Sequence, residues 1–81
     1  MPLYTYVMSH RNRTEVSQHR FSNPTGFLLT PIADGFPELK PFFGQLARMR
    51  PEPVAGAERT WQCSAEISGD AFMLHVVETR G

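Results

Sequence analysis

The sequence holds little of what catalytic and metal-binding signatures require. It has one cysteine and three histidines, and none of these residues fall at a metal-ligand spacing such as C-x-x-C or H-x-x-x-H. Its six glycines are scattered, so no glycine-rich phosphate loop stands ahead of a helix. The sequence therefore predicts no metal site, no cofactor and no catalytic residue.

The chain also lacks an excess of charge of either sign and a long apolar run. Eight basic residues balance eight acidic ones, which removes the general electrostatic argument for a nucleic-acid or anionic-membrane partner. Apolar runs such as residues 71–74 are far shorter than the roughly 20 residues that cross a bilayer. Because a single cysteine forms no internal disulfide and no charged-then-apolar leader is seen, we expect a cytoplasmic protein without a membrane partner.

The residues that are present fit one small folded domain over 1–81. The chain is 41% hydrophobic and 20% charged, which is typical of a globular protein rather than a disordered tail. A chain this short buries only about 60% of its unfolded surface, so its core is small and its stability is modest or shared with a partner. The small size and the lack of eukaryotic features favour a bacterial or phage source.

The N-terminal region predicts a β-hairpin. Residues 3–9 and 14–20 are rich in aromatic and β-branched residues or alternate in polarity, and Arg11 and Asn12 between them suit a two-residue turn in which Asn tolerates positive φ. This turn pairs Val7 with Val16. One face then carries Thr5 and the two valines, and the other carries Tyr4, Tyr6 and Met8. The pattern leaves open which face is buried.

The middle of the chain predicts one helix. Asp34 occupies an N-cap position ahead of a proline-containing first turn, and from Pro37 to about Met49 four apolar residues recur at helical spacing: Leu39, Phe42, Phe43 and Leu46. Pro41 is an obstacle inside this segment, so the helix can begin nearer Glu38 or Lys40. Residues 27–29 before it form an edge strand or an irregular core-capping piece.

The C-terminal region predicts a second hairpin. Apolar residues alternate through 61–67 and again through 72–76, with Ser68, Gly69 and Asp70 at the turn. Taking Gly69 and Asp70 as the loop, Ile67 faces Phe72 and Cys63 faces Val76. The fold class is therefore α+β: a four-stranded antiparallel sheet in ββαββ order with one helix across one face.

Along a strand, successive side chains point to opposite faces, and this alternation separates the candidate nucleophile Cys63 from its candidate base His75. Cys63 points to the core, whereas His75 points to the opposite face, so their side chains diverge. Among the carboxylates only Glu78 falls on the core face, opposite Trp61, near a strand end. The enzyme hypothesis stays open, but the sequence leans against it.

The outer face of the second hairpin is more apolar than a solvated face usually is. Met73, His75 and Val77 lie there beside Gln62, which predicts a protein interface, or cover by the N-terminal hairpin. We expect a non-enzymatic interaction or accessory domain whose partner is another protein or a second copy of the chain.

The alternative function is nucleic-acid binding by the N-terminal hairpin. Aromatic side chains that stack on bases and basic side chains that contact phosphates would both be available there if the tyrosine face were exposed. The residues concerned are Tyr4, Tyr6, Arg11, Arg13 and Arg20.

Overall fold

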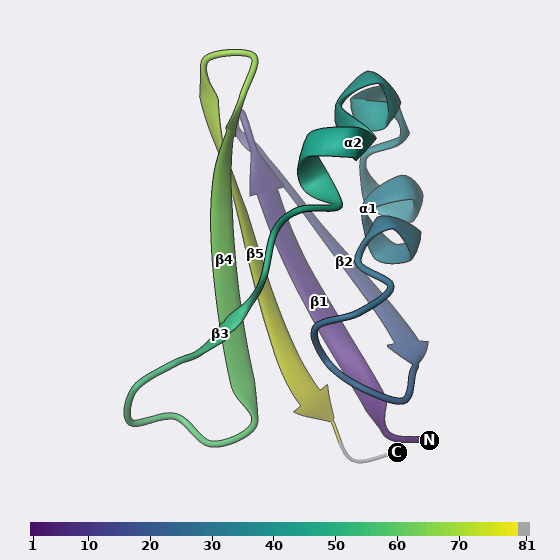
Figure 1. The fold of residues 1–81 in the computed structure, drawn as a ribbon, viewed down its shortest axis with the longest axis vertical. Coiled ribbons are helices and arrows are strands. Elements are labelled where there is room, and N and C mark those ends of the chain that lie inside the picture. Colours follow the sequence, from purple (N-terminus) through teal and green to yellow (C-terminus); the bar gives the residue numbers. More distant parts are fainter. Residues whose placement is uncertain (80–81) are drawn as a thin grey trace.

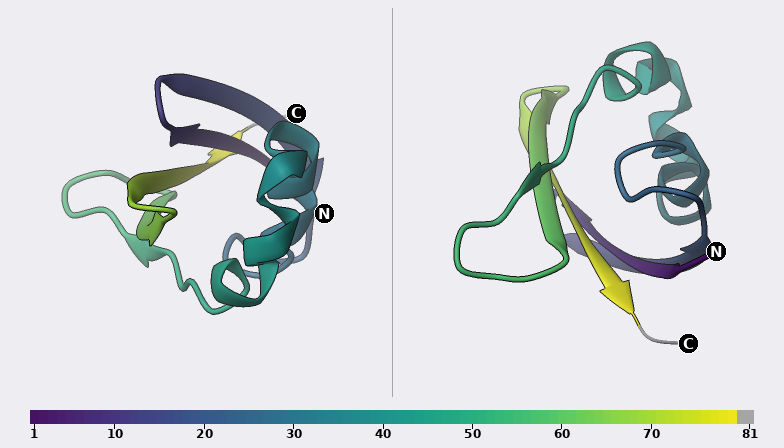
Figure 2. Two further views of the ribbon diagram at one scale, coloured as in Figure 1. Left: turned by 90° about the horizontal axis from the view of Figure 1, so that it is seen from above. Right: turned by 60° about the horizontal axis from the view of Figure 1, so that its bottom comes forward.

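The computed structural model describes residues 1–79, which form one twisted antiparallel sheet with short helical segments on one side (Figures 1 and 2). The sheet has five strands in the order β2-β1-β5-β4-β3. The strands are β1 (Leu3–His10), β2 (Arg13–Arg20), β3 (Glu52–Pro53), β4 (Thr60–Ile67) and β5 (Asp70–Thr79); the helical segments are α1 (Leu29–Gly35), the 3-10 helix η1 (Pro37–Phe42) and α2 (Phe43–Leu46). The predicted α+β class and antiparallel sheet are confirmed, with a fifth, two-residue strand at one edge and the helix in separate pieces.

The N-terminal hairpin has the predicted register. Val7 pairs with Val16 and His10 with Arg13, on either side of the Arg11–Asn12 turn. The positive φ of this turn falls on Arg11, at 51°, rather than on Asn12 as expected. Along β1 the even-numbered residues are buried, so the tyrosine face is the one that packs against the helical layer.

The first strand also pairs with the last one. β1 lies antiparallel to β5, with Val7 beside His75 and Tyr6 beside Val76. This pairing adds the N-terminal hairpin to the edge of the C-terminal hairpin. The prediction that it could instead cover the outer face of that hairpin is wrong.

The C-terminal hairpin is shifted by two residues from the predicted register. Its turn is Ser68–Gly69, with φ of 53° and 82°, and Ile67 pairs with Asp70 while Cys63 pairs with Leu74. Two consecutive residues with positive φ suit the twist of a tight hairpin, and this turn sets the register. A shift of two residues keeps every side chain on its predicted face.

The predicted helix over 37–49 is broken. Pro41 has no N–H to donate within the helix, and residues around it form the 3-10 segment η1 before α2 begins. Asp34 lies in the last turn of α1 rather than at an N-cap. Of the two predicted forms of residues 27–29, the edge strand is wrong. The irregular core-capping piece holds for Phe27 and Leu28, since Leu28 is buried in the core, whereas Leu29 begins α1.

The core lies between the sheet and the helical layer. Its fully buried large side chains come from both layers: Tyr6, Met8, Ile32, Phe36, Leu46, Ile67, Phe72, Leu74 and Val76. At the end of α1, a Cβ on Gly35 would lie 2.9 Å from the Glu15 Cβ and 3.0 Å from the Met8 Cε, so only glycine fits this approach to the sheet. None of the helices over residues 1–79 is long and apolar enough to cross a membrane.

Candidate functional site

The side of the sheet that faces away from the helices is not covered by any described segment (Figure 2). We call it the open face. Its central side chains come from neighbouring positions of four strands: Thr5, Val7, Val16, Gln62, Met73, His75 and Val77. Val16 is 63% exposed, and Met73 and Val77 are each 37% exposed. These are three of the five large hydrophobic side chains that the described part of the chain leaves exposed.

All four residues predicted as a protein interface lie on the open face. Met73, His75 and Val77 alternate along β5, and Gln62 on β4 pairs with His75, whose Nε2 lies 3.1 Å from the Gln62 Oε1. The prediction did not include Val16, although the hairpin register had already placed it on the same face as Val7. Pairing of β1 with β5 brings both valines beside the predicted set.

The two tyrosines of the nucleic-acid hypothesis lie in the core. Tyr4 is 3% exposed and packs edge-on against Trp61, with ring centroids 6.2 Å apart. Tyr6 is fully buried, and burial raises its pKa to about 12. Neither ring is available to stack on a base, so this part of the hypothesis is wrong.

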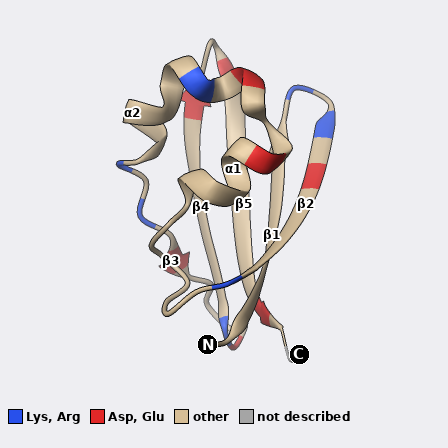
Figure 3. Cartoon of the chain, turned by 90° about the vertical axis from the view of Figure 1, so that its right-hand side faces the viewer, with Lys and Arg blue, Asp and Glu red and all other residues tan. Residues whose placement is uncertain are grey.

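The three arginines of that hypothesis all have partners within the chain. The Arg11 Nε lies 2.9 Å from Asp70, and the Arg13 Nη1 lies 2.6 Å from Glu38 while its Nη2 donates to the Gly35 carbonyl. Arg20 donates to the Met1 carbonyl at 3.2 Å. Figure 3 shows acidic residues of the helical layer close to the basic end of the β1–β2 hairpin. These ion pairs are exposed and therefore weak, so they lower the charge available at the hairpin end without removing it, and Arg20 has no acidic partner among the described residues.

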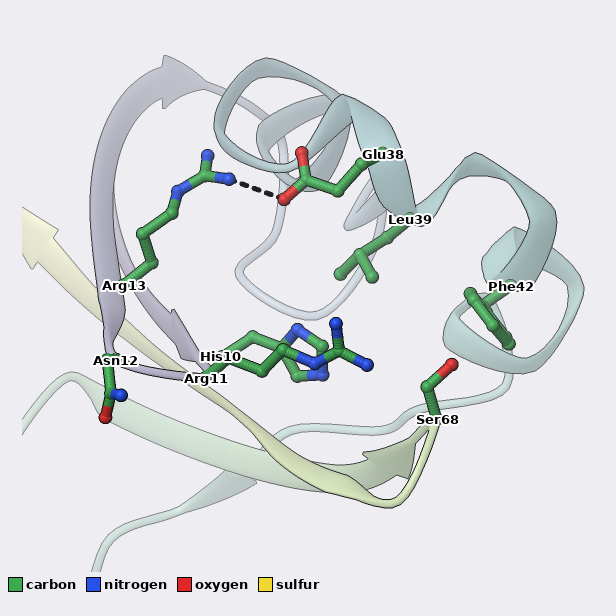
Figure 4. A pocket seen from close by; sticks show the side chains of 8 residues that line it. All are labelled: His10, Arg11, Asn12, Arg13, Glu38, Leu39, Phe42 and Ser68. Atoms are coloured by element: carbon green, nitrogen blue, oxygen red, sulfur yellow. Dashed lines mark hydrogen bonds and ion pairs between the residues drawn. The ribbon is translucent and has the colours of Figure 1, made fainter.

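A cavity of about 500 Å³ opens between the two hairpin turns and η1 (Figure 4). Leu39 and Phe42 give it an apolar wall, and the Nε2 of the buried His10 forms a hydrogen bond with the Ile67 carbonyl at 3.1 Å. Arg11 and Arg13 lie at its rim, each already paired with a carboxylate. The cavity thus offers no uncompensated charge to a ligand.

Ser17, His19 and Asp34 form a cluster that sequence spacing did not reveal. The His19 Nε2 lies 2.6 Å from the Ser17 Oγ and 2.9 Å from the Asp34 Oδ2. A catalytic triad needs the serine on one ring nitrogen and the carboxylate on the other, so that one nitrogen takes the proton while the other is held. Here both partners share one nitrogen. The cluster therefore fastens α1 to β2 and is not a nucleophile with its base.

Cys63 and His75 lie on opposite faces of the sheet, as predicted. The Cys63 Sγ packs 3.9 Å from the Met49 Sδ, and burial raises the pKa of this thiol to about 11. A thiol with such a pKa is protonated at neutral pH and is a weak nucleophile. Glu78 pairs across the sheet with Tyr4 rather than facing Trp61, and its carboxylate lies 3.4 Å from Arg59. Over residues 1–79, histidine, cysteine and acidic side chains form no group of three that could hold a metal ion.

Comparisons with protein-family models, with curated proteins and with solved structures gave no match for this chain.

Proposed function

We propose that this protein is an interaction domain that pairs with a second copy of itself through the open face of its sheet. The observation that supports this proposal is the apolar centre of the open face, where Val7 on β1 lies between the exposed Val16 on β2 and the exposed Met73 and Val77 on β5. An antiparallel sheet that faces water on one side normally presents polar residues there. Contiguous exposed apolar side chains are a feature of interaction sites.

The size of the open face suits a modest homodimer. Four long strands spaced about 4.8 Å apart, each rising about 3.3 Å per residue over eight residues, span roughly 19 by 26 Å, or about 500 Å². Two such faces bury about 1,000 Å² together, which is near the lower limit for specific interfaces. We therefore expect association with a Kd of about 10 μM or weaker.

Charge also favours pairing through the face. The centre of the open face holds no charged residue, so two copies can approach without like-charge repulsion. The two edge strands of the sheet are less suited to pairing with a second copy. β3 has only two residues and includes Pro53, and β2 carries Arg13, Glu15 and Arg20. Short, proline-containing or charged edge strands discourage pairing with another chain.

The proposal is tested by sedimentation equilibrium over a range of chain concentrations. The wild-type chain is expected to approach twice the mass of one chain as concentration rises, and Val16→Lys is expected to remain a monomer. Val16 is exposed in the monomer, so a lysine there can extend into water without disturbing the core. Ala33→Lys places the same charge on α1, away from the open face, and should dimerise like the wild type. A wild-type chain that stays monomeric at millimolar concentration would rule the proposal out.

A further inference from the structure

A second cavity, of about 590 Å³, lies between the loop that precedes α1 and the segment that follows α2. Its size is within the range of small-molecule sites. Its lining is apolar at Leu28, Leu29 and Met49, and it contains one charged residue, Arg50. It therefore differs from the cavity between the hairpin turns, where each arginine is paired with a carboxylate.

Arg50 forms no ion pair with an acidic side chain of the described residues, although it lines a neighbouring cavity together with Glu52. Its Nη1 donates to the carbonyls of Ala47 and Met49, at 3.1 and 2.9 Å, which holds the guanidinium at the cavity. Among residues 1–79 no carboxylate forms an ion pair with Arg50, and no acidic residue lines the cavity. Arginine presents its remaining N–H groups in a planar fork that matches a phosphate or carboxylate.

An aromatic stack ends at this cavity. The ring of His19 stacks on Phe21 at 5.4 Å, and Phe21 stacks on Phe27 at 5.1 Å. Phe27 is the last ring of the stack, lines the cavity and remains 58% exposed. A further planar ring can therefore continue the stack on Phe27.

The backbone holds Phe27 in an unusual conformation. Its φ is 60°, in the left-handed region that bulky residues rarely adopt, whereas the adjacent Gly26 has no positive φ. Strained residues of this kind gather at ligand sites, where the surrounding structure maintains them. The exposed ring of Phe27 is thus held at the cavity by a backbone conformation that costs free energy.

From these contacts we infer that this cavity binds a small molecule with one planar ring and one phosphate or carboxylate group. The ring lies on Phe27 over the apolar lining, and the anionic group pairs with Arg50. The hydroxyl of Thr25 and the amide of Asn23 line the same cavity and can donate to polar groups of the ligand. This inference does not depend on the pairing of two copies through the open face.

The probes for testing it are AMP and indole-3-acetate, which carry a ring with a phosphate or a carboxylate. Binding is followed by amide chemical shifts of the full chain in NMR titrations. We expect at least one probe to shift residues of 23–30 and 47–50, and the tighter of the two identifies the anionic group. Adenosine, which lacks the anion, should bind at least about tenfold more weakly, since a hydrogen bond to a charged group contributes about that factor. Inorganic phosphate, which lacks the ring, should also bind about tenfold more weakly, since stacking of one base on an aromatic ring contributes a similar factor.

Variants separate the two contacts. Arg50→Gln should weaken the binding probe by about tenfold or more without changing the affinity for adenosine. Phe27→Leu should weaken the binding of both the probe and adenosine. Phe27→Gly should have the same effect while it relieves the backbone strain. Arg48→Gln removes an exposed arginine that does not line the cavity and is the matched control. All four retain the wild-type fold if their spectra outside the cavity are unchanged.

Three results would overturn the inference. The first is that neither probe shifts the cavity residues at millimolar concentration. The second is that Arg48→Gln weakens binding as much as Arg50→Gln, which would indicate a diffuse charge effect. The third is tighter binding of a single-stranded oligonucleotide than of AMP at the same residues, which would indicate a macromolecular ligand.

Discussion

Replacing Tyr6 by phenylalanine is expected to stabilise the protein. The Tyr6 side chain is fully buried, and its hydroxyl has no hydrogen-bond partner among residues 1–79. A buried polar group without a partner costs about 1–3 kcal/mol, whereas its removal leaves the ring contacts with His19 and Phe21 in place. Since a small void would remain, we expect a gain of about 1–2 kcal/mol in the free energy of unfolding.

The gain is large enough to measure in a chain of this size. One kcal/mol shifts the Tm of a small domain by about 4–8 °C, so Tyr6→Phe should melt roughly 5–15 °C higher than the wild type. Thermal unfolding followed by circular dichroism gives the Tm, and denaturant unfolding gives the free energy of unfolding. Both proteins must be compared at one concentration, because self-association makes the Tm depend on concentration.

The same hydroxyl makes stability depend on alkaline pH. Burial raises the pKa of Tyr6 to about 12 from its ordinary value of 10.0, with a smaller contribution from Tyr4. The folded state therefore holds this proton more tightly than the unfolded state, and the resulting stability is complete below pH 10 and is lost as pH rises toward 12. A shift of this size corresponds to about 2–3 kcal/mol. Tyr6→Phe should lose less stability over this window, although Tyr4, whose pKa is also raised, keeps part of the slope.

A Tyr6→Phe variant that melts lower than the wild type would refute this reasoning. It would show that the hydroxyl makes a favourable hydrogen bond, for example to an ordered water. If stability fell equally with alkaline pH in both proteins, the pKa of Tyr6 would not differ between the folded and the unfolded state.

Two further predictions concern the core. Gly35→Ala should lower the free energy of unfolding by about 1–3 kcal/mol, because the new Cβ would overlap Glu15 and Met8. Denaturant unfolding measures this loss. Gly44→Ala is the control, because nothing lies within 4 Å of a Cβ at that position. An unchanged stability for Gly35→Ala would contradict the close approach of α1 to the sheet. Cys63 should react slowly with a disulfide reagent at pH 8 in the folded protein and quickly after unfolding, since burial raises its pKa to about 11. Equal rates in the two states would show that the thiol is not protected.

The local elements of this fold were largely predictable because they depend on neighbouring residues. The turn at Arg11–Asn12 and the pairing of Val7 with Val16 follow from the chain within one hairpin. The broken helix was only partly predictable. The sequence identified Pro41 as an obstacle, but α1, which ends just before Pro37 and buries Ile32 in the core, was not predicted.

The candidate sites differ in how far the sequence revealed them. Met73, His75 and Val77 were predicted as an outer face because alternation alone separates them from the core. The cavity beside Phe27 was not predicted. It joins residues about twenty positions apart in segments without periodic pattern, and neither its aromatic stack nor the unpaired Arg50 leaves a sequence signal.

The sequence by itself determined which side chains share a face, because successive residues of a strand point to opposite sides of the sheet. It did not determine which face of the N-terminal hairpin is buried, nor the register of Ile67 with Asp70, since registers two residues apart bury the same side chains. The Ser68–Gly69 turn set that register, and the tertiary structure decided which face of the N-terminal hairpin is buried. Pairing of β1 with β5, more than sixty residues away, directs Tyr4 and Tyr6 toward the helical layer and leaves Val7 and Val16 on the open face, because only that arrangement gives one continuous core under the helices.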